Sequence, residues 1–353
     1  MPIVKFKPNR VRRNYLGGKG IDVLQNRLPA KDTDQPEEWI ASTIEASNKG
    51  LHPVENEGLS VLDDQQLFIE RIQANPAHYL GNKHIEKYGL SLGFLMKLLD
   101  SSMRLHTQAH PTREFAQKYL KSEWGKFEAY YILKIRDAEE GYIRLGFQHA
   151  PTKEQWQKML LEQDLERMDA CFEKIPIREG DVVYIPGGVP HAIGENVLMV
   201  EIMEPSDLVI RCEFEREGIV VPEEARFMGK GMDFCLDVFD YTAYSVVDIQ
   251  EKFFLEKQLV AETSVAQINR LVPASIAHSF EVFSLALQGT YHFEKDERFW
   301  TGVCTKGSVK ITADNKEVVI ERGESFFLAS TAKKVVFEVS EATEICLVSN
   351  VLD

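Results

Sequence analysis

Four side chains with metal-binding atoms occur in order along the middle of the sequence: Gln108, His110, Glu128 and His191. The first two are two residues apart in an expected strand, so their side chains point to the same face. The other two must reach the same ion from neighbouring strands. Two imidazoles, a carboxylate and an amide oxygen suit zinc or a similar divalent ion with one coordination position open. Because the set contains no thiolate, it favours a catalytic metal over a structural one.

The segment 180–201, GDVVYIPGGVPHAIGENVLMVE, is expected to position His191. It predicts a turn, a short buried strand over 182–185 and a return strand from Val197, and the glycines after Pro186 permit positive φ. Taken alone, a histidine in such a loop is more often a hydrogen-bonding group than a metal ligand. Its three partners elsewhere in the chain favour the ligand interpretation.

Charged residues are expected close to the ligands. The apolar run 92–99 carries one charge, Lys97, and a buried lysine is costly unless its ammonium meets an anion or lines a cavity. Alternation over an expected strand at 103–109 places His106 on the face of the two ligands that follow it. On the next strand, Lys126 lies two residues before a ligand and points to the same side. These residues predict a cation-rich cavity beside the metal.

The composition excludes several classes of function. The chain has 353 residues, 44% hydrophobic and 27% charged, as ordinary soluble proteins do. Its net charge of -14 argues against non-specific binding to nucleic acid or anionic membranes, but a local cation cluster can still bind a small anion. Five separated cysteines without a CxxC pair indicate no disulfide framework, and no run approaches the roughly 18 apolar residues of a membrane span. We therefore expect a cytoplasmic protein.

Strand-like runs dominate the chain, and helical patterns interrupt them at about 111–123 and 152–174. Beyond residue 280 short strands alternate with turns, which is typical of an all-β sandwich or barrel. The polar segment 247–270 is interpreted as the connection into this region. We expect a mainly β protein with helical insertions and two domains, an N-terminal catalytic domain at 1–245 and a C-terminal β domain at 246–353.

The two expected domains contain one similar stretch each. The segment 323–334, GESFFLASTAKK, repeats the spacing of 180–191, GDVVYIPGGVPH, and carries Lys334 where the first copy has His191. A coincidental match of strand, turn and strand is the alternative. We favour a duplicated β-barrel whose second copy has lost its metal chemistry.

The motifs together resemble a known family. Gly180-x5-Pro186-x-Gly188-x2-His191 followed by Asn196 resembles the second cupin motif, with one extra residue before the asparagine. The longer series resembles the type I phosphomannose isomerases, also called mannose-6-phosphate isomerases, and above all their short bacterial members. It covers roughly residues 10 to 215 in order and is weaker beyond, and its anchors are Lys97-Leu-Leu-Asp100, Gln108-Ala-His110-Pro111, Gly125-Lys126-Phe127-Glu128, Tyr184-Ile-Pro-Gly-Gly-Val-Pro-His191, Glu201-Ile, Ser206-Asp207 and Arg211.

The resemblance implies a fold, a cofactor and a reaction. The fold is two cupin-like (jelly-roll) β-barrels, the second degenerate and metal-free. One Zn2+ or another divalent ion per chain would be bound by Gln108, His110, Glu128 and His191. The reaction would interconvert mannose 6-phosphate and fructose 6-phosphate through a cis-enediolate.

The resemblance also implies roles around the metal. Arg211, Lys126 and Glu201 are the expected catalytic residues, and the base stays open among Glu201, Lys126 and a metal-bound water. The residues expected to bind the substrate are Lys97, His106, Lys126 and Arg211. The alternatives are an ion pair between Lys126 and Glu201 and a strand-edge charge at Arg211.

Two departures from the family pattern lie on the pocket side. Short bacterial members usually carry a serine at the position of His106, and the segment 203–211 keeps Ser206-Asp207 and Arg211 but is otherwise altered. They leave open a different sugar or sugar phosphate, or a sugar-sensing cupin without turnover. An iron-binding cupin dioxygenase is less favoured because the pocket cations suit an anionic sugar. The expected partner is thus a small sugar phosphate, without nucleic acid or membrane, for a monomer or homodimer.

Overall fold

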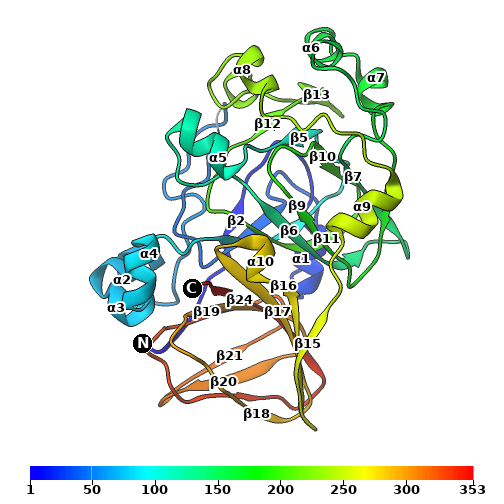
Figure 1. Ribbon diagram of the computed structural model, residues 1–353. Helices are drawn as coiled ribbons and strands as arrows, with labels where there is room; N and C mark the ends of the chain where they lie inside the picture. The colour runs from blue at the N-terminus through cyan, green and yellow to red at the C-terminus, as the bar shows by residue number, and fades with distance from the viewer. Residues whose placement is uncertain (49, 353) are drawn as a thin grey trace.

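Two β-barrels, each made of a larger and a smaller antiparallel sheet, dominate the computed structural model, which describes residues 1–48 and 50–352 (Figure 1). The upper barrel of Figure 1 contains the predicted metal ligands. The lower barrel is formed mainly by residues beyond 257, at the orange and red end of the colour scale. The expectation of a mainly β protein with two cupin-like barrels is confirmed.

The first barrel pairs a six-stranded with a five-stranded sheet. The six-stranded sheet has the order β2 (Arg10–Val11), β3 (Glu37–Ile40), β4 (Leu95–Asp100), β11 (Val197–Met203), β6 (Glu128–Ile135) and β9 (Val182–Ile185). The five-stranded sheet has the order β12 (Ile210–Arg211), β5 (Gln108–Ala109), β10 (His191–Ile193), β7 (Gly141–Leu145) and β8 (Ile175–Ile177). Apolar side chains of both sheets, such as Ile132 and Leu145, pack in one buried cluster.

The strand predictions around the site are mostly confirmed. The buried strand at 182–185 is β9, and the run around Lys97 is β4, of which every residue is buried. The strand expected over 103–109 shrinks to two residues, Gln108–Ala109. One cause is that the Thr107 N–H donates to the Glu213 carboxylate at 3.2 Å, so a side chain takes the bond that a neighbouring strand would accept.

The second barrel pairs a seven-stranded with a four-stranded sheet. The larger sheet has the order β1 (Ile3–Lys5), β22 (Ser325–Leu328), β19 (Trp300–Lys306), β24 (Thr343–Asn350), β17 (Phe280–Leu287), β16 (Ala266–Val272) and β15 (Gln258–Glu262). The smaller has the order β18 (Thr290–Phe293), β23 (Val335–Glu338), β20 (Val309–Ala313) and β21 (Lys316–Ile320). Ile3 on β1 lies opposite Leu328 on β22, so the first strand of the chain completes a sheet of the second barrel.

The segment 247–270, interpreted as the connection into the second region, is itself formed of a helix and two strands. Helix α9 (Val246–Phe253) begins with a capping box between Ser245 and Asp248 and buries Ile249 and Phe253. Strands β15 and β16 follow as a hairpin. The segment is polar because β15 is an edge strand whose residues are mostly exposed, and charged or polar edges protect a sheet from unwanted pairing.

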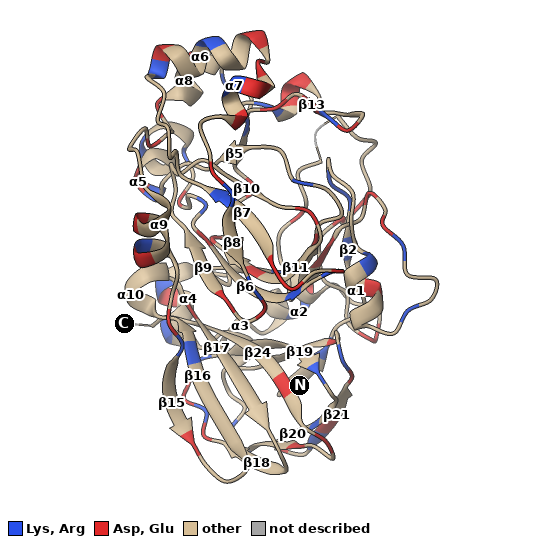
Figure 2. Cartoon of the chain, turned by 90° about the vertical axis from the view of Figure 1, so that its right-hand side faces the viewer, with Lys and Arg blue, Asp and Glu red and all other residues tan. Residues whose placement is uncertain are grey.

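The helical insertions predicted at 111–123 and 152–174 are present. The first contains α5 (Arg113–Phe115) and the π-helix η1 (Ala116–Leu120), and the second contains α6 (Lys153–Glu162) and α7 (Leu165–Asp169). Helices α6, α7 and α8 (Met232–Leu236) gather at the end of the first barrel that faces away from the second (Figures 1 and 2). The remaining short elements are α1 (Lys19–Leu24), α2 (Phe68–Ala74), α3 (Pro76–Tyr79), α4 (Asn82–Tyr88), β13 (Glu215–Arg216), β14 (Ile219–Val220), η2 (Glu223–Ala225) and α10 (Ala274–Ala277).

Within the described residues, no helix has both the length and the apolar character that crossing a bilayer requires.

Candidate active site

Three of the four predicted ligands meet inside the first barrel. The potential ligand atoms of His110, Glu128 and His191 all lie within 4.8 Å of one another, and the three side chains are buried. Glu128 Oε1 is 3.0 Å from His110 Nε2, and its Oε2 is 3.4 Å from His191 Nε2. Gln108 lies opposite His191 in the β5–β10 register, with its amide nitrogen 3.3 Å from His191 Nε2. The structure therefore brings all four predicted ligands together.

Backbone carbonyls hold the Nδ1 atoms of both imidazoles, so their Nε2 atoms face the carboxylate. His110 Nδ1 donates to the Leu208 carbonyl at 2.9 Å, and His191 Nδ1 donates to the Val189 carbonyl at 3.0 Å, because a carbonyl can only accept. Burial, with the nearby Lys126, lowers the pKa of His110 to about 3, so its Nε2 carries no proton at neutral pH. That buried nitrogen has no hydrogen-bond partner.

Lone pairs that face a carboxylate repel it unless a cation lies among them. The donor set therefore fits a divalent metal, and backbone carbonyls that fix the histidine tautomers are a usual feature of metal sites. The oxygen and nitrogen of a glutamine amide exchange places by a half turn, so Gln108 can offer its oxygen to the same ion.

The Pro-Gly-Gly turn joins the two histidine-bearing segments. Gly188 has φ 89°, a conformation that favours glycine, and its N–H donates to the His110 carbonyl at 2.7 Å. A Cβ atom on Gly187 would lie 2.6 Å from the Thr112 Cα. The glycines thus allow the turn that precedes His191 to pack directly against the backbone around His110.

A cavity opens beside the cluster. The charged and polar side chains that line it are Arg13, Asn14, Tyr15, Glu37, Lys97, His106, Gln108, Lys126, Glu128, Glu201, Asp207 and Arg211. All the residues predicted to bind the substrate or to act in catalysis are among them.

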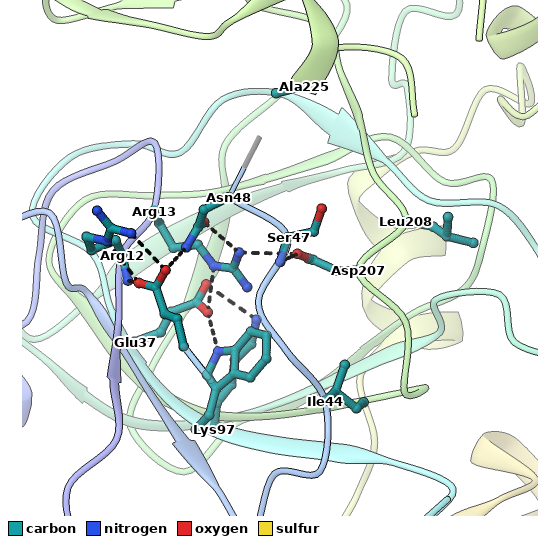
Figure 3. Close-up of polar contacts among 12 residues, drawn as sticks. Arg12, Arg13, Glu37, Ile44, Ser47, Asn48, Lys97, Asp207, Leu208 and Ala225 are labelled. Carbon is teal, nitrogen blue, oxygen red and sulfur yellow. Dashed lines mark hydrogen bonds and ion pairs between the residues drawn. The ribbon is translucent and has the colours of Figure 1, made fainter. Parts of the chain in front are cut away.

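Ion pairs link the cavity residues into a row of alternating charge. Lys97 lies opposite Glu201 in the β4–β11 register, and its Nζ is 3.1 Å from Glu201 Oε2 and 3.4 Å from Glu37 Oε1. Glu37 Oε2 in turn accepts from Arg13 Nε at 2.9 Å (Figure 3). Lys126 is paired with a metal-ligand candidate rather than with Glu201, so the alternative ion pair is not what the structure shows.

The two buried carboxyls beside Lys97 differ in their affinity for protons. Burial raises the pKa of Glu201 to about 8, and repulsion from Glu128 adds to the effect that Lys97 opposes. Burial also acts on Glu37, but Arg13 and Lys97 together hold its pKa well below the usual range. Glu201 can therefore hold a proton near neutral pH while Glu37 remains ionised.

Arg211 and His106 line the cavity and form no close ion pair among the described residues, although Asp207 acts on Arg211 and Glu213 on His106. Arg211 Nη1 donates to the Ala225 carbonyl at 2.6 Å, and within the described chain no carboxylate lies within ion-pair distance of its guanidinium. Burial lowers the pKa of Arg211 to about 10 and that of His106 to about 4. The buried His106 Nε2 has no hydrogen-bond partner. Both side chains are available to a ligand.

Sequence reasoning assigned no role to five polar or charged residues of the cavity: Arg13, Asn14, Tyr15, Glu37 and Asp207. Tyr15 donates its hydroxyl to Glu37 Oε1 at 2.6 Å. A signal for Glu37 existed in the strand Glu37–Ile40, where two adjacent carboxylates precede a tryptophan. Trp39 is buried in the core, and the buried carboxylates beside it were not recognised from the sequence.

The fold is that of a cupin with two barrels, and the comparisons support an aldose–ketose isomerase. A family profile described as "Mannose-6-phosphate isomerase, cupin domain" matches residues 274–350, in the second barrel. A mannose-6-phosphate isomerase of Streptococcus mutans is 24% identical over 333 residues, which cover 94% of this chain and 90% of that protein.

Solved structures share the fold along nearly the whole chain. The mannose 6-phosphate isomerase of Bacillus subtilis superposes with a TM-score of 0.75 at 19% identity, covering 99% of this chain and 100% of that one. A mannose 6-phosphate isomerase bound with zinc and yttrium gives a TM-score of 0.69 at 14% identity, with 99% and 100% covered. The chain is thus similar to mannose-6-phosphate isomerases along most of its length, and its second barrel matches the cupin-domain profile of that family.

Proposed function

We propose that this protein interconverts mannose 6-phosphate and fructose 6-phosphate through a cis-enediolate, with one zinc ion held by Gln108, His110, Glu128 and His191. The observation that carries the proposal is the convergence of His110, Glu128 and His191 beside a cavity lined by Lys97, Lys126, Glu201 and Arg211. Similarity to mannose-6-phosphate isomerases supports the sugar phosphate, and the zinc-bound relative supports the choice of metal.

The bound metal would supply positive charge that polarises the substrate oxygens near it. The protein residues then divide the remaining work. Glu201 carries the proton between C1 and C2, because burial places its pKa near neutrality and general acid–base groups work best there. Lys97, at 3.1 Å, stabilises the carboxylate form each time that proton is given up.

Two cations would face the negative charge that develops on the two adjacent oxygens of the enediolate. Lys126 lies 3.2 Å from Glu128 Oε1, beside the metal cluster. Arg211, on β12, lies opposite Gln108 in the strand register, and Asp207 is the carboxylate that acts on it most strongly. Such preorganised charges stabilise a transition state more than the ground state.

The test is a coupled assay of the zinc-loaded protein with mannose 6-phosphate, with and without a chelator. We expect turnover that the chelator removes and that His110→Ala lacks. The panel should include other aldose 6-phosphates and free aldoses, since the unpartnered His106 Nε2 faces a cavity that selects among hydroxyl arrangements. A protein that retains zinc and binds sugars but isomerises none of them would refute the enzyme and leave a sugar-sensing cupin.

A further inference from the structure

Arg13 is a buried cation of the cavity with an anchoring pattern unlike that of the lysines. Its Nε donates to Glu37 Oε2 at 2.9 Å, and its guanidinium carbon lies 5.0 Å from the centre of the Trp39 ring. Its Nη1 donates to Asn48 Oδ1 and to Asp207 Oδ2, each at 3.3 Å (Figure 3). One edge of the guanidinium is therefore fixed by strand β3, and the other meets groups on loops.

The Nη2 atom of Arg13 has no hydrogen-bond partner in the described part of the chain, and Arg13 lines the cavity. A guanidinium offers two parallel N–H groups to a phosphate or a carboxylate. Because Nη1 makes only two long bonds, both terminal nitrogens can serve an incoming anion while Nε keeps the side chain in place.

Arg13 is connected to the neighbourhood of the metal cluster by a row of ion pairs along the cavity. The row runs from Arg13 through Glu37, Lys97 and Glu201, and the His–Glu–His cluster lies beyond it. A hexose 6-phosphate has the same polarity. Its reacting carbons C1 and C2 are at one end and its phosphate is at the other. A sugar whose C1 and C2 oxygens face the metal cluster thus directs its phosphate toward the Arg13 end.

An anion of the protein itself already occupies this end. The Asp207 carboxylate accepts from Arg13 Nη1 and, at 3.1 Å, from the Ser47 backbone N–H. It belongs to the loop between β11 and β12, and it lines both the inner cavity and a second depression that includes Ser47 and Ala225. Asp207 therefore lies between the cavity and the outside, bonded to the same guanidinium.

We propose that Arg13 binds the phosphate group of the sugar phosphate substrate, and that this phosphate takes the place of the Asp207 carboxylate on the guanidinium. The inference rests on the proposed function for the identity of the substrate. It adds a residue that determines specificity for phosphorylated over free sugars, and it assigns Asp207 as an internal competitor for the phosphate position.

The test uses mannitol 1-phosphate, which carries a terminal phosphate but no carbonyl group and so cannot be isomerised. Its binding to the zinc-loaded protein is measured by calorimetry. Arg13→Gln should weaken binding about 30-fold, the range of a lost charge-assisted hydrogen bond. It should also raise KM for mannose 6-phosphate by a similar factor while kcat changes less than about threefold. A merely structural role would instead lower kcat and zinc content as well.

Two further variants keep the result interpretable. Arg12→Gln removes the neighbouring cation, which pairs with Glu57 outside the cavity, and should leave binding unchanged. Asp207→Asn removes the competing carboxylate and should tighten binding of mannitol 1-phosphate several-fold, which gives an answer even if Arg13→Gln fails to fold. Unchanged affinity in a folded Arg13→Gln, or weaker binding by Asp207→Asn, would overturn the inference.

The two proposals fail in different ways. The wild-type protein could bind mannitol 1-phosphate through Arg13 but isomerise no aldose phosphate. That result would refute the proposed reaction and support the phosphate site. Turnover of mannose 6-phosphate that Arg13→Gln leaves intact in both KM and kcat would do the reverse. Absence of any hexitol phosphate binding to the wild type would refute the phosphate site.

Discussion

The two barrels share one architecture but fill their interiors in opposite ways. The first holds a buried row of charges beside its apolar cluster, including Glu37, Lys97 and Glu201. The second is filled by aromatic and aliphatic side chains such as Phe326 and Phe337, and the long strands of its large sheet are mostly tan in Figure 2. Buried charges cost free energy and buried apolar surface supplies it. The comparison indicates that one barrel stabilises the chain while the other carries the chemistry.

The matched strands β9 and β22 show where the two barrels diverge. Both are four-residue strands that follow a glycine with positive φ, at Gly180 and Gly323. After β9 the chain turns inward and buries His191. After β22 the corresponding Lys334 is exposed. The repeat detected in the sequence is thus real at the level of the strand, and the loops after it differ. That the second barrel binds no metal remains a prediction.

The largest expected effect belongs to the first barrel. His110→Ala should lower isomerase turnover by about 10³-fold or more, because the metal cluster loses a ligand. Zinc content per chain, measured by atomic spectroscopy, should fall with it. The matched control is His292→Ala, an exposed histidine on β18 of the second barrel, which should keep both turnover and zinc. Equal losses in the two variants would break the division of labour.

The second expected effect belongs to the apolar barrel. Phe337 is fully buried against Phe293 and Phe326, and Phe337→Ala should lower the free energy of unfolding by about 3–5 kcal/mol. Urea unfolding followed by fluorescence measures the change, with the exposed Val319→Ala on β21 as control. Zinc content of the folded fraction should stay at the wild-type value. A selective loss of zinc would show that the barrels are not separable in this way.

A change of intermediate size concerns Glu201. Glu201→Gln should lower kcat about 10²-fold, the usual contribution of a general acid–base group. In metal-free protein the folded state holds this proton more tightly than the unfolded chain does, because burial raises the pKa of Glu201 to about 8. Its stabilising effect is full below the unfolded pKa and is lost as pH rises through about 8. The wild type should therefore lose stability relative to the variant between pH 5 and 9, and parallel curves would contradict this.

The smallest expected effect is the change of the urea midpoint on removing an exposed lysine, which is compared with the removal of a buried one. Lys310 on β20 pairs with Glu338 at the surface of the second barrel, where solvent screens the attraction. Lys310→Met should leave the urea midpoint unchanged. Lys97→Met should lower the midpoint, because the buried carboxylates of Glu37 and Glu201 lose the cation with which they pair. A larger shift for Lys310→Met than for Lys97→Met would contradict the contrast between the barrels.

The metal ligands could be found from the sequence because local rules position them. Alternation along a strand places Gln108 and His110 together, and the glycine turn before His191 is readable from residue types alone. The place of Arg13, Glu37 and Asp207 in the cavity could not be predicted, because it depends on burial and on partners far away in the chain. Arg13, for example, bonds to Asp207 across 194 positions. A charged residue in a polar segment gives no local sign that the fold will enclose it.

The pairing partners of whole strands were equally out of reach. The residue types of β1 suit a strand, but nothing in them indicates that β1 lies beside β22 rather than in the first barrel. The hairpin β15–β16 was missed for the opposite reason, since its exposed edge lacks the apolar residues by which strands are recognised. Its turn is nevertheless tied by Thr263, whose side chain accepts from the Ala266 N–H at 3.0 Å.

The position of β1 has a consequence for the order of folding during synthesis. A ribosome makes Ile3 long before its partner Leu328. The nascent first barrel must therefore carry a short unpaired apolar strand until the rest of the chain is complete. Pairing between distant segments is slow because the intervening loop must close first. Pairing of β1 with β22 would then be a late step of folding. A protease would cleave chains that have not yet completed this step more readily than folded ones.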